Sequence, residues 1–563
     1  IFLGSRPPQT QPKPRKICLA SILSSSPESA SWLAGMAASV GVVPPPCTSE
    51  RKAPSFSGTF KFVGGRCSPW DGETIEVRSP LIDPSTGMRT VLSRVASFSE
   101  LDALRAAEVA ALAWDQGQGY WPQLPLGARV TALRRLAEGL APVRQQLASM
   151  LVREICKSSA DAAAEVDGAI EVIASTAEAV EAADGSEDFS AWSTIAGVRG
   201  RALRRPVGVV MLTAPAEAPL LDVYSMMIPA LAMGNTIVLK LPTSGGLTHM
   251  LTVKALEQAL PPGVVNFVSG SCVRTLEPIM RSGLVDCLGF MGDSEVLSKL
   301  IIKHPQPHRL RVFSQLAGKN VAVVLPDADL QVAASVLAKG SLTFNGQCRD
   351  AFKLVLAHDS IAEALVENLA AQVSSLKCGM PWEEDVTITP LVERSRSGRL
   401  EGLITDAVEN GASVANAASG GGSRAGALFV PIVVFPVAAG ARLFREDQSG
   451  PVIPVATFSD TLELSAALKS HSWSAPQAAI FSSSGTKVAP LIDMLSTAVK
   501  HVSINGHCCH GRGRDERFVT EALSAFSTQT VVAFPDGIKN RLVMESMEEE
   551  AKCFQPAKRQ RLG

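Results

Sequence analysis

The stretch from residue 206 to residue 240 limits the folds open to this chain more than any other part of it. Residues 207–212 form an unbroken apolar run, which is typical of a strand buried on both faces. A second strand pattern at 236–240 follows a helical segment and the turn Gly234-Asn235. Strands that alternate with helices in this way predict a parallel sheet of the Rossmann type within an α/β fold.

Length and charge narrow the class of protein further. The chain has 563 residues, enough for two or three domains with large cores. Hydrophobic residues make up 46% and charged residues 19%, as in soluble globular proteins. The formal net charge is -1, so no overall charge attracts nucleic acid or an anionic membrane surface. Apolar runs such as 429–441 are too short to span a bilayer. We therefore expect a small-molecule partner, no nucleic acid and no membrane.

The cysteines indicate the redox compartment. The chain has 11 of them, scattered and without any C-x-x-C spacing. This pattern favours reduced thiols in a cytosolic or organellar compartment over a disulfide framework or a zinc site. We expect no bound metal.

Residues 1–55 are rich in Pro, Ser, Ala and basic residues and show no packing period. They are interpreted as a disordered tail. Part of an organelle transit peptide is one alternative, and a start at Met36 is another. The expected location is cytoplasmic, or organellar if this segment is a transit peptide.

Several local elements follow from pattern alone. Residues 60–63 alternate like a strand that ends in a turn. Ser99 is a plausible N-cap for an amphipathic helix that continues to about Trp114. Ala-rich helical patterns are expected at 127–147 and 147–182.

The segment 344–353 reads F-N-G-Q-C-R-D-A-F-K. It resembles the nucleophile loop of the aldehyde dehydrogenase superfamily, written G-Q-R-C-T-A-x-K. The residues in register are Gly346, Gln347, Ala351 and Lys353. Two positions are exchanged: Cys348 stands where the family has Arg, and Arg349 stands where it has the catalytic thiol.

Further segments carry the same resemblance in one colinear order, from about residue 58 to residue 534. They are 228–243 for the helix, Gly-Asn turn and K-P-x-T strand (with Leu241 inserted after the lysine), 290–295 for F-T-G-S, 315–320 for E-L-G-G-K, 446–454 for E-E-P-F-G-P-V-x-P, and 512–515 for R-G-P-D. Residues 388–393 and 401–403 bring the chain closest to the non-phosphorylating, NADP-dependent glyceraldehyde-3-phosphate dehydrogenases.

The resemblance implies an aldehyde dehydrogenase fold, with a Rossmann-type cofactor domain, an α/β catalytic domain and bridging oligomerisation strands. The expected division is a disordered or targeting segment at 1–55, a cofactor-binding domain at 56–318 with a bridging element at about 183–204, a catalytic domain at 319–518, a C-terminal bridging strand at 519–537 and a tail at 538–563.

In the family a Cys thiolate attacks the aldehyde, an Asn amide and a backbone N–H stabilise the oxyanion, and a Glu activates water. The matching positions here are Arg349, Glu217 and Gln315. A guanidinium has no lone pair fit for attack, and an amide takes no proton at a useful pH. A carboxylate at Glu217 opposes a developing negative charge. We therefore expect a pseudoenzyme that binds nucleotide or a partner without turnover.

The alternative is an active NAD(P)-dependent aldehyde dehydrogenase with a site rebuilt around Cys348 and Glu217. One step along a helix turns a side chain by about 100°. A nucleophile displaced in this way loses its attack geometry unless the loop has rearranged. A second hypothesis is that Glu217 and Arg349 form an ion pair across the old active site, because unpaired charges in a closed cleft are costly.

The cofactor implied by the resemblance is NADP, or NAD. Lys240 would bind the adenosine ribose and Thr243 would lie near a 2′-phosphate, which favours NADP. Gly292 and Ser294 would approach the pyrophosphate. On the nicotinamide side Asp447 replaces a Glu that holds the ribose, and Ser449 replaces a Phe that packs by the ring, so this end is expected to bind more weakly.

The phosphate of an aldehyde substrate would meet Arg512, although His510 is the alternative match because the region 506–514 has extra residues. The family's segment before its last strand is shortened here. We expect a homo-oligomer weakened by that shortening.

Overall fold

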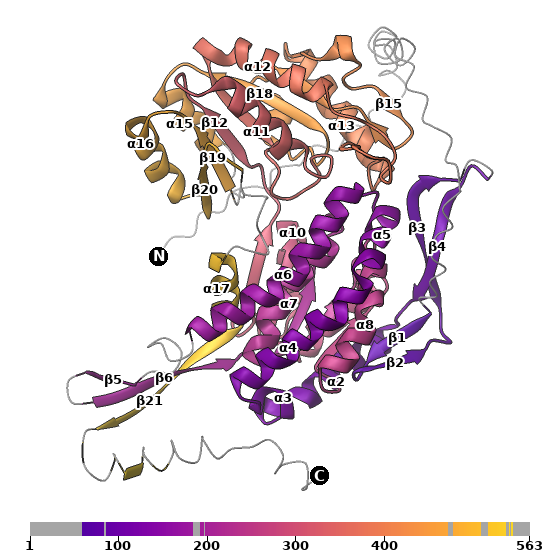
Figure 1. The fold of residues 1–563 in the computed structure, drawn as a ribbon, viewed down its shortest axis with the longest axis vertical. Coiled ribbons are helices and arrows are strands. Elements are labelled where there is room, and N and C mark those ends of the chain that lie inside the picture. The colour runs from indigo at the N-terminus through magenta and orange to yellow at the C-terminus, as the bar shows by residue number, and fades with distance from the viewer. Residues whose placement is uncertain are drawn as a thin grey trace, which may run out of the picture. The chain divides into compact units, whose positions relative to one another are not determined.

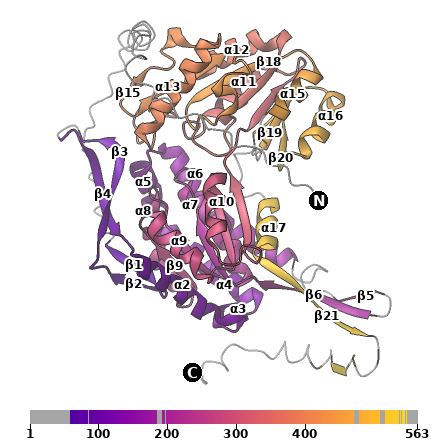
Figure 2. The same cartoon turned by 180° about the vertical axis from the view of Figure 1, so that it is seen from behind.

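A computed structural model describes residues 59–83, 86–183, 192–195, 198–470, 477–507 and 516–535, with isolated positions between 537 and 546 (Figure 1). Figure 2 shows the same chain from behind. The transit-peptide prediction for 1–55 lies outside these residues.

Two antiparallel hairpins open the described chain. The strand predicted at 60–63 is confirmed as β1 (Phe60–Val63), which pairs with β2 (Arg66–Pro69). Gly64 and Gly65 both have positive φ and form the turn between them. A longer hairpin follows, made of β3 (Thr74–Ile82) and β4 (Arg89–Ala96).

Helix α2 (Glu100–Trp114) confirms the predicted start at Ser99. The Ser99 hydroxyl accepts from the backbone N–H of Asp102, and the Asp102 carboxylate accepts from the N–H of Ser99, a reciprocal capping box. Four alanines of this helix are fully buried, so α2 packs closely against the sheet beside it.

The expected helices at 127–147 and 147–182 are interrupted. The structure has α4 (Leu126–Leu140), a turn η2 (Ala141–Val143), α5 (Arg144–Glu154) and α6 (Ser159–Ala183). Pro142 breaks the first pattern because it lacks a backbone N–H. Cys156 has φ 56 and Ser158 caps the next helix, so the second pattern breaks as well. No helix in the described part of the chain is both long and apolar enough to cross a membrane.

A five-stranded parallel sheet confirms the Rossmann-type prediction. Its order is β11-β10-β7-β8-β9, and all neighbours run parallel. The chain moves outward from β7 in one direction and returns to add β10 on the other side of β7. The elements are β7 (Val209–Thr213), α7 (Pro219–Met233), β8 (Thr236–Lys240), α8 (Gly246–Ala259), β9 (Val265–Val268), α9 (Cys272–Ser282), β10 (Cys287–Gly292), α10 (Ser294–Lys303) and β11 (Arg311–Leu316).

Both faces of this sheet are buried, which explains the unbroken apolar run at 207–212. Val210 and Leu212 belong to a core with α4, α6 and α7, whereas Val209 and Met211 belong to a second core with α2 and α9. Alternate side chains of a strand point to opposite faces, so a strand covered on both sides has no polar position.

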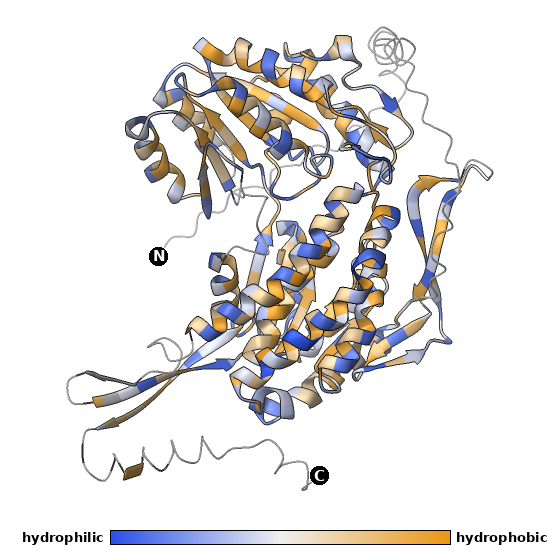
Figure 3. Ribbon diagram, viewed as in Figure 1, coloured by the Kyte–Doolittle hydropathy of each residue, from blue (hydrophilic) through white to orange (hydrophobic). Residues whose placement is uncertain are grey.

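A seven-stranded sheet follows, in the order β14-β17-β18-β13-β12-β19-β20. The side chains of β12 alternate between two cores in the same way, with Val323 in one and Val324 in the other. Figure 3 shows β18 and its neighbours coloured mostly hydrophobic. The elements are β12 (Val321–Val324), α11 (Leu330–Leu342), β13 (Leu354–His358), α12 (Asp359–Ser374), α13 (Arg394–Glu409), β14 (Ser413–Val414), β17 (Ile432–Phe435), β18 (Val452–Phe458), α15 (Thr461–Ser470), β19 (Gln477–Phe481), α16 (Gly485–Ser496) and β20 (His501–Ile504).

A three-stranded antiparallel sheet combines distant parts of the chain. Strand β6 (Val198–Pro206) lies between β5 (Trp192–Ile195) and β21 (Ser527–Pro535). Helix α17 (Glu516–Ala525) leads into β21. These strands fall in the segments predicted to bridge subunits, and that bridging role stays a prediction.

Candidate active site

The loop 344–350 connects α11 to β13 and has a strained backbone. Phe344, Asn345 and Gly346 have φ of 47, 57 and 66. The Asn345 side chain exchanges two hydrogen bonds with Thr389, of 3.1 and 2.9 Å. Two successive non-glycine residues in the left-handed region persist only where the surroundings fix them, which is typical of functional loops. The surroundings therefore hold this loop in a defined conformation.

Arg349 is buried at the base of this loop, with 7% of its surface exposed. Its Nη1 lies 3.2 Å from Asp222 Oδ2, and its Nη2 lies 3.4 Å from Asp222 Oδ1. The same Nη2 donates to Gln315 Oε1 at 3.1 Å. Asp350 Oδ1 is 3.9 Å from Nε. The guanidinium is thus held by two carboxylates and an amide, in the forked geometry that Arg favours.

The predicted Glu217–Arg349 ion pair is wrong. Glu217 lies in the loop between β7 and α7, and its Oε1 is 3.3 Å from Arg396 Nη2. Arg349 pairs instead with Asp222, in the first turn of α7. The buried Asp222 and the half-buried Glu217 each have their own arginine, because an uncompensated charge away from solvent is costly.

Sequence reasoning missed both Asp222 and Arg396. Asp222 had a signal: it is the single charged residue in α7, whose sequence is PLLDVYSMMIPALAM. A carboxylate inside an otherwise apolar, buried helix requires a partner. Arg396 had no comparable signal, since α13 begins with several arginines and serines.

Gln315 and Cys348 complete this part of the site. Gln315 is the last but one residue of β11, and its side-chain oxygen accepts from Arg349. Cys348 is half-buried. Asn320 Nδ2 donates to the Arg349 carbonyl at 2.8 Å, which fixes the backbone next to Cys348. The catalytic roles of these positions stay predictions.

The parallel sheet offers a nucleotide crevice at its carboxyl edge. The order in which strands are added to the sheet reverses between the parallel neighbours β7 and β10. In sheets of this kind, ligands bind outside the carboxyl ends of the strands at that point. Gly292 ends β10 with φ 148, and Ser294 begins α10. Asp293 between them accepts from the N–H groups of Glu295 and Val296 at 2.7 and 3.4 Å. The N-terminus of α10 is therefore already capped by a carboxylate.

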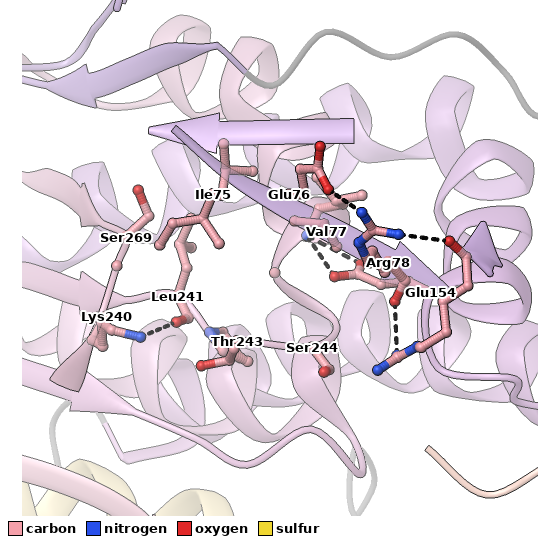
Figure 4. Close-up of a pocket in the computed structure, with 16 residues that line it drawn as sticks. Ile75, Glu76, Val77, Arg78, Glu154, Lys240, Leu241, Thr243, Ser244 and Ser269 are labelled. Atoms are coloured by element: carbon pink, nitrogen blue, oxygen red, sulfur yellow. Dashed lines mark hydrogen bonds and ion pairs between the residues drawn. The ribbon is translucent and has the colours of Figure 1, made fainter. Parts of the chain in front are cut away.

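A cavity of about 200 Å³ lies beyond the ends of β8 and β9. Lys240 and Ser269 lie at one end of it and Glu154 at the other, with Thr243 and Ser244 along its floor (Figure 4). Strands β3 and β4 form the rest of the wall.

The charged groups of this cavity are strongly affected by burial. Lys240 Nζ donates to Leu241 O at 2.6 Å, and burial lowers the Lys240 pKa. Glu154 accepts from the N–H of Leu247 in the first turn of α8 at 3.1 Å. Burial raises its pKa to about 8 against these favourable backbone hydrogen bonds. The cavity is polar at both ends and has a buried cation, which suits a phosphorylated ligand.

The segment 446–450 forms the opposite part of the site. Lys319 is fully buried and donates to Leu443 O, Glu446 O and Gln448 Oε1 at 2.7 to 2.8 Å, which fixes this segment. Asp447 lies 3.4 Å from Lys353 Nζ. Burial alone would raise the Asp447 pKa, but Lys353 and the Ser449 N–H outweigh it and leave the pKa lowered.

A nicotinamide cofactor fits only one end of this site. Lys240 and Thr243 line an open cavity, as the binding of an adenosine end requires. At the other end Arg396 Nη1 donates to Ser449 Oγ at 2.8 Å and Nη2 donates to Glu217, so the residue expected beside the nicotinamide is bonded to a guanidinium that is paired with a carboxylate. The residues present do not fit the nicotinamide half.

Two further predictions concern the substrate phosphate and a metal ion. Arg512, expected to bind substrate phosphate, and its alternative His510 lie outside the described residues. In the described part of the chain, no group of three or more His, Cys, Asp or Glu is placed to hold a metal ion.

Comparisons with known proteins agree with this fold and loop. Residues 70–514 match the aldehyde dehydrogenase family. The NADP-dependent glyceraldehyde-3-phosphate dehydrogenase of Streptococcus equinus is 31% identical over 430 residues, covering 75% of this chain and 86% of that relative. The enzyme of the same name from Nicotiana plumbaginifolia is 31% identical over 382 residues, covering 67% and 74%.

A solved structure shares the fold across nearly its full length. It is the NADP-dependent glyceraldehyde-3-phosphate dehydrogenase of Bacillus halodurans C-125 complexed with NADP, with a TM-score of 0.75 and 25% identity, covering 85% of this chain and 99% of that one. Homologues in this family bind NADP or NAD. The strand order, the strained loop and these matches together make the chain a member of the aldehyde dehydrogenase family.

Proposed function

We propose that this protein is a catalytically silent aldehyde dehydrogenase family member that binds an adenine nucleotide without oxidising an aldehyde. The observation that carries the proposal is Arg349, which stands buried at the nucleophile position with its guanidinium paired to Asp222 and bonded to Gln315.

Arg349 removes the nucleophile in two ways. A guanidinium stays protonated and offers no electron pair to an aldehyde carbon. Its bidentate pairing with Asp222 also fixes it in place, so it does not swing aside to expose another group.

The base and the oxyanion donor are absent as well. Gln315 carries an amide that takes no proton, and its oxygen already accepts from Arg349. Glu217 presents a carboxylate where the family has an amide donor, and a negative charge there raises the energy of an oxyanion. Residues that act as a unit lose nearly all their effect once one member is gone.

The proposal is tested by measuring aldehyde oxidation and nucleotide binding on the same protein. NADPH formation would be measured with glyceraldehyde 3-phosphate and with simple aldehydes, in the parent protein and in Cys348→Ala. Thermal unfolding would be followed with and without NADP. We expect no NADPH and a raised melting temperature with NADP.

The matched control is Cys378→Ala, which removes another half-buried thiol that is not part of the 344–350 loop. NADPH formation that is abolished by Cys348→Ala and kept in Cys378→Ala would overturn the proposal in favour of an enzyme rebuilt around Cys348. Absence of both turnover and stabilisation by any adenine nucleotide would overturn the nucleotide-binding half of it.

A further inference from the structure

The two sides of the proposed nucleotide crevice differ in how much room they leave for a ligand. On one side of the point where the strand order reverses, beyond β8 and β9, the cavity next to Lys240 is open. On the other side, beyond β7 and β11, Arg349 donates to Gln315 and Arg396 donates to Glu217.

The open side has unused hydrogen-bonding capacity. The Lys240 ammonium carries three N–H donors, and among the described residues the structure records one acceptor for them, Leu241 O at 2.6 Å. The side chain is buried, with 2% of the residue exposed, and its nitrogen faces the cavity (Figure 4). A buried cation with donors to spare is stabilised by an anion, and the hydroxyls of Thr243 and Ser244 line the same space.

The size of the open side limits the ligand. The cavity volume is about 200 Å³. Pockets that enclose drug-sized ligands usually measure roughly 300 to 1,000 Å³. The open side therefore suits a phosphorylated nucleoside better than a complete dinucleotide.

The closed side is held by one side chain that spans two segments. Arg396, in the first turn of α13, bonds Glu217 from the β7–α7 loop through Nη2 and Ser449 through Nη1. Only 23% of the Arg396 side chain and 18% of the Glu217 side chain are exposed. A serine at position 449 leaves room for the Arg396 guanidinium, and a glutamate at 217 gives it a counter-charge, so these two substitutions support one another.

We infer that this chain recognises the 2′-phosphorylated adenosine half of NADP alone, and that the Arg396 bridge to Glu217 and Ser449 excludes the nicotinamide half. The inference rests on the proposed nucleotide binding, and it adds which part of the ligand is bound.

Calorimetric titration of the full-length protein tests this with three probes: NADP, adenosine 2′,5′-bisphosphate and nicotinamide mononucleotide. We expect NADP and the bisphosphate to bind with dissociation constants within about threefold of each other, and the mononucleotide not to bind. NADP binding tenfold or more tighter than the bisphosphate would overturn the inference and leave the proposed function intact. No binding of either adenine ligand would overturn both.

Single substitutions test whether Arg396 is the residue that limits NADP affinity. In Arg396→Ala we expect NADP to bind at least fivefold tighter while the bisphosphate affinity stays unchanged. Arg424→Ala is the control, since it removes an exposed arginine paired with Glu401 at 2.8 Å. Lys240→Ala should weaken both adenine ligands at least tenfold.

The double variant Glu217→Gln/Arg396→Ala opens the same bridge without leaving a carboxylate unpaired, and it replaces Arg396→Ala if the single variant does not fold. Equal NADP affinity in the parent and in the opened variant would overturn the role of the bridge.

Discussion

Arg349 and Asp222 form a buried, two-pronged ion pair, with Nη1 to Oδ2 at 3.2 Å and Nη2 to Oδ1 at 3.4 Å. The two residues are 127 positions apart in the chain. The pair connects the loop 344–350, which follows α11, to the first turn of α7, and so it joins parts of the chain that belong to the two large sheets.

Breaking this pair from either side should destabilise the protein strongly. Asp222→Leu or Arg349→Leu leaves one buried charge without its partner, a change that costs about 3–5 kcal/mol. The double variant Asp222→Leu/Arg349→Leu removes both charges and should regain most of the loss. Urea unfolding of the four proteins gives the coupling energy directly. Additive single effects would show that the contact is not an energetic pair.

Glu154 predicts a pH-dependent stability. Its pKa is about 8 in the folded protein and 4.5 for an ordinary glutamate, so between these values the folded state holds a proton that the unfolded chain has lost. Stability from this group is therefore full at low pH and falls as pH rises toward 8.

The variant Glu154→Gln isolates this group. The glutamine side chain does not titrate, but it keeps an oxygen that accepts from the Leu247 N–H. Its stability relative to the parent should increase with pH, by at most about 1.4 kcal/mol per pH unit in this window. Chemical denaturation at several pH values measures the difference, and parallel profiles for the two proteins would contradict the assignment.

Gly346 should not tolerate a side chain. Its φ is 66, and a Cβ there would lie 2.3 Å from the Gly450 carbonyl oxygen. Gly346→Ala should destabilise the protein by about 2 kcal/mol or more, because both strain and a backbone clash result. Gly398→Ala is the matched control: it lies inside α13 with open space around it, so alanine should be neutral or stabilise by about 1 kcal/mol. Equal melting temperatures for the two variants would contradict this reading of the loop.

Asn235 should be a strong stabilising residue of the sheet. Its Oδ1 accepts from the N–H groups of Val207 and Gly208, and its Nδ2 donates to Ala230 O and Phe526 O. Asn235→Ala removes the partner of the Val207 and Gly208 N–H groups and of Phe526 O, whereas Ala230 O keeps its bond from the backbone N–H of residue 235. We expect a loss of about 3 kcal/mol in the free energy of unfolding. Thr236→Val, which removes a single hydroxyl bond to Ala110 O, should cost clearly less.

Much of the architecture could be predicted because it depends on short-range pattern. The apolar runs gave the parallel strands, Ser99 gave the start of α2, and Gly234 with φ 97 ends α7 as the Gly-Asn turn indicated. The break at Cys156 was not predicted, since an Ala-rich helical pattern continues on both sides of it and only tertiary packing fixes the φ of one residue.

The sequence by itself determined the family, which the match over residues 70–514 confirms. It also led to the proposal that Arg349, Gln315 and Glu217 stand at altered catalytic positions. Only the tertiary structure decided which charges meet. Residues 217 and 222 are five positions apart, yet one faces Arg396 and the other Arg349. Ion pairing depends on distances of a few ångströms and on the direction of each side chain, and these are set by how helix α7 and the loop packed against it are oriented.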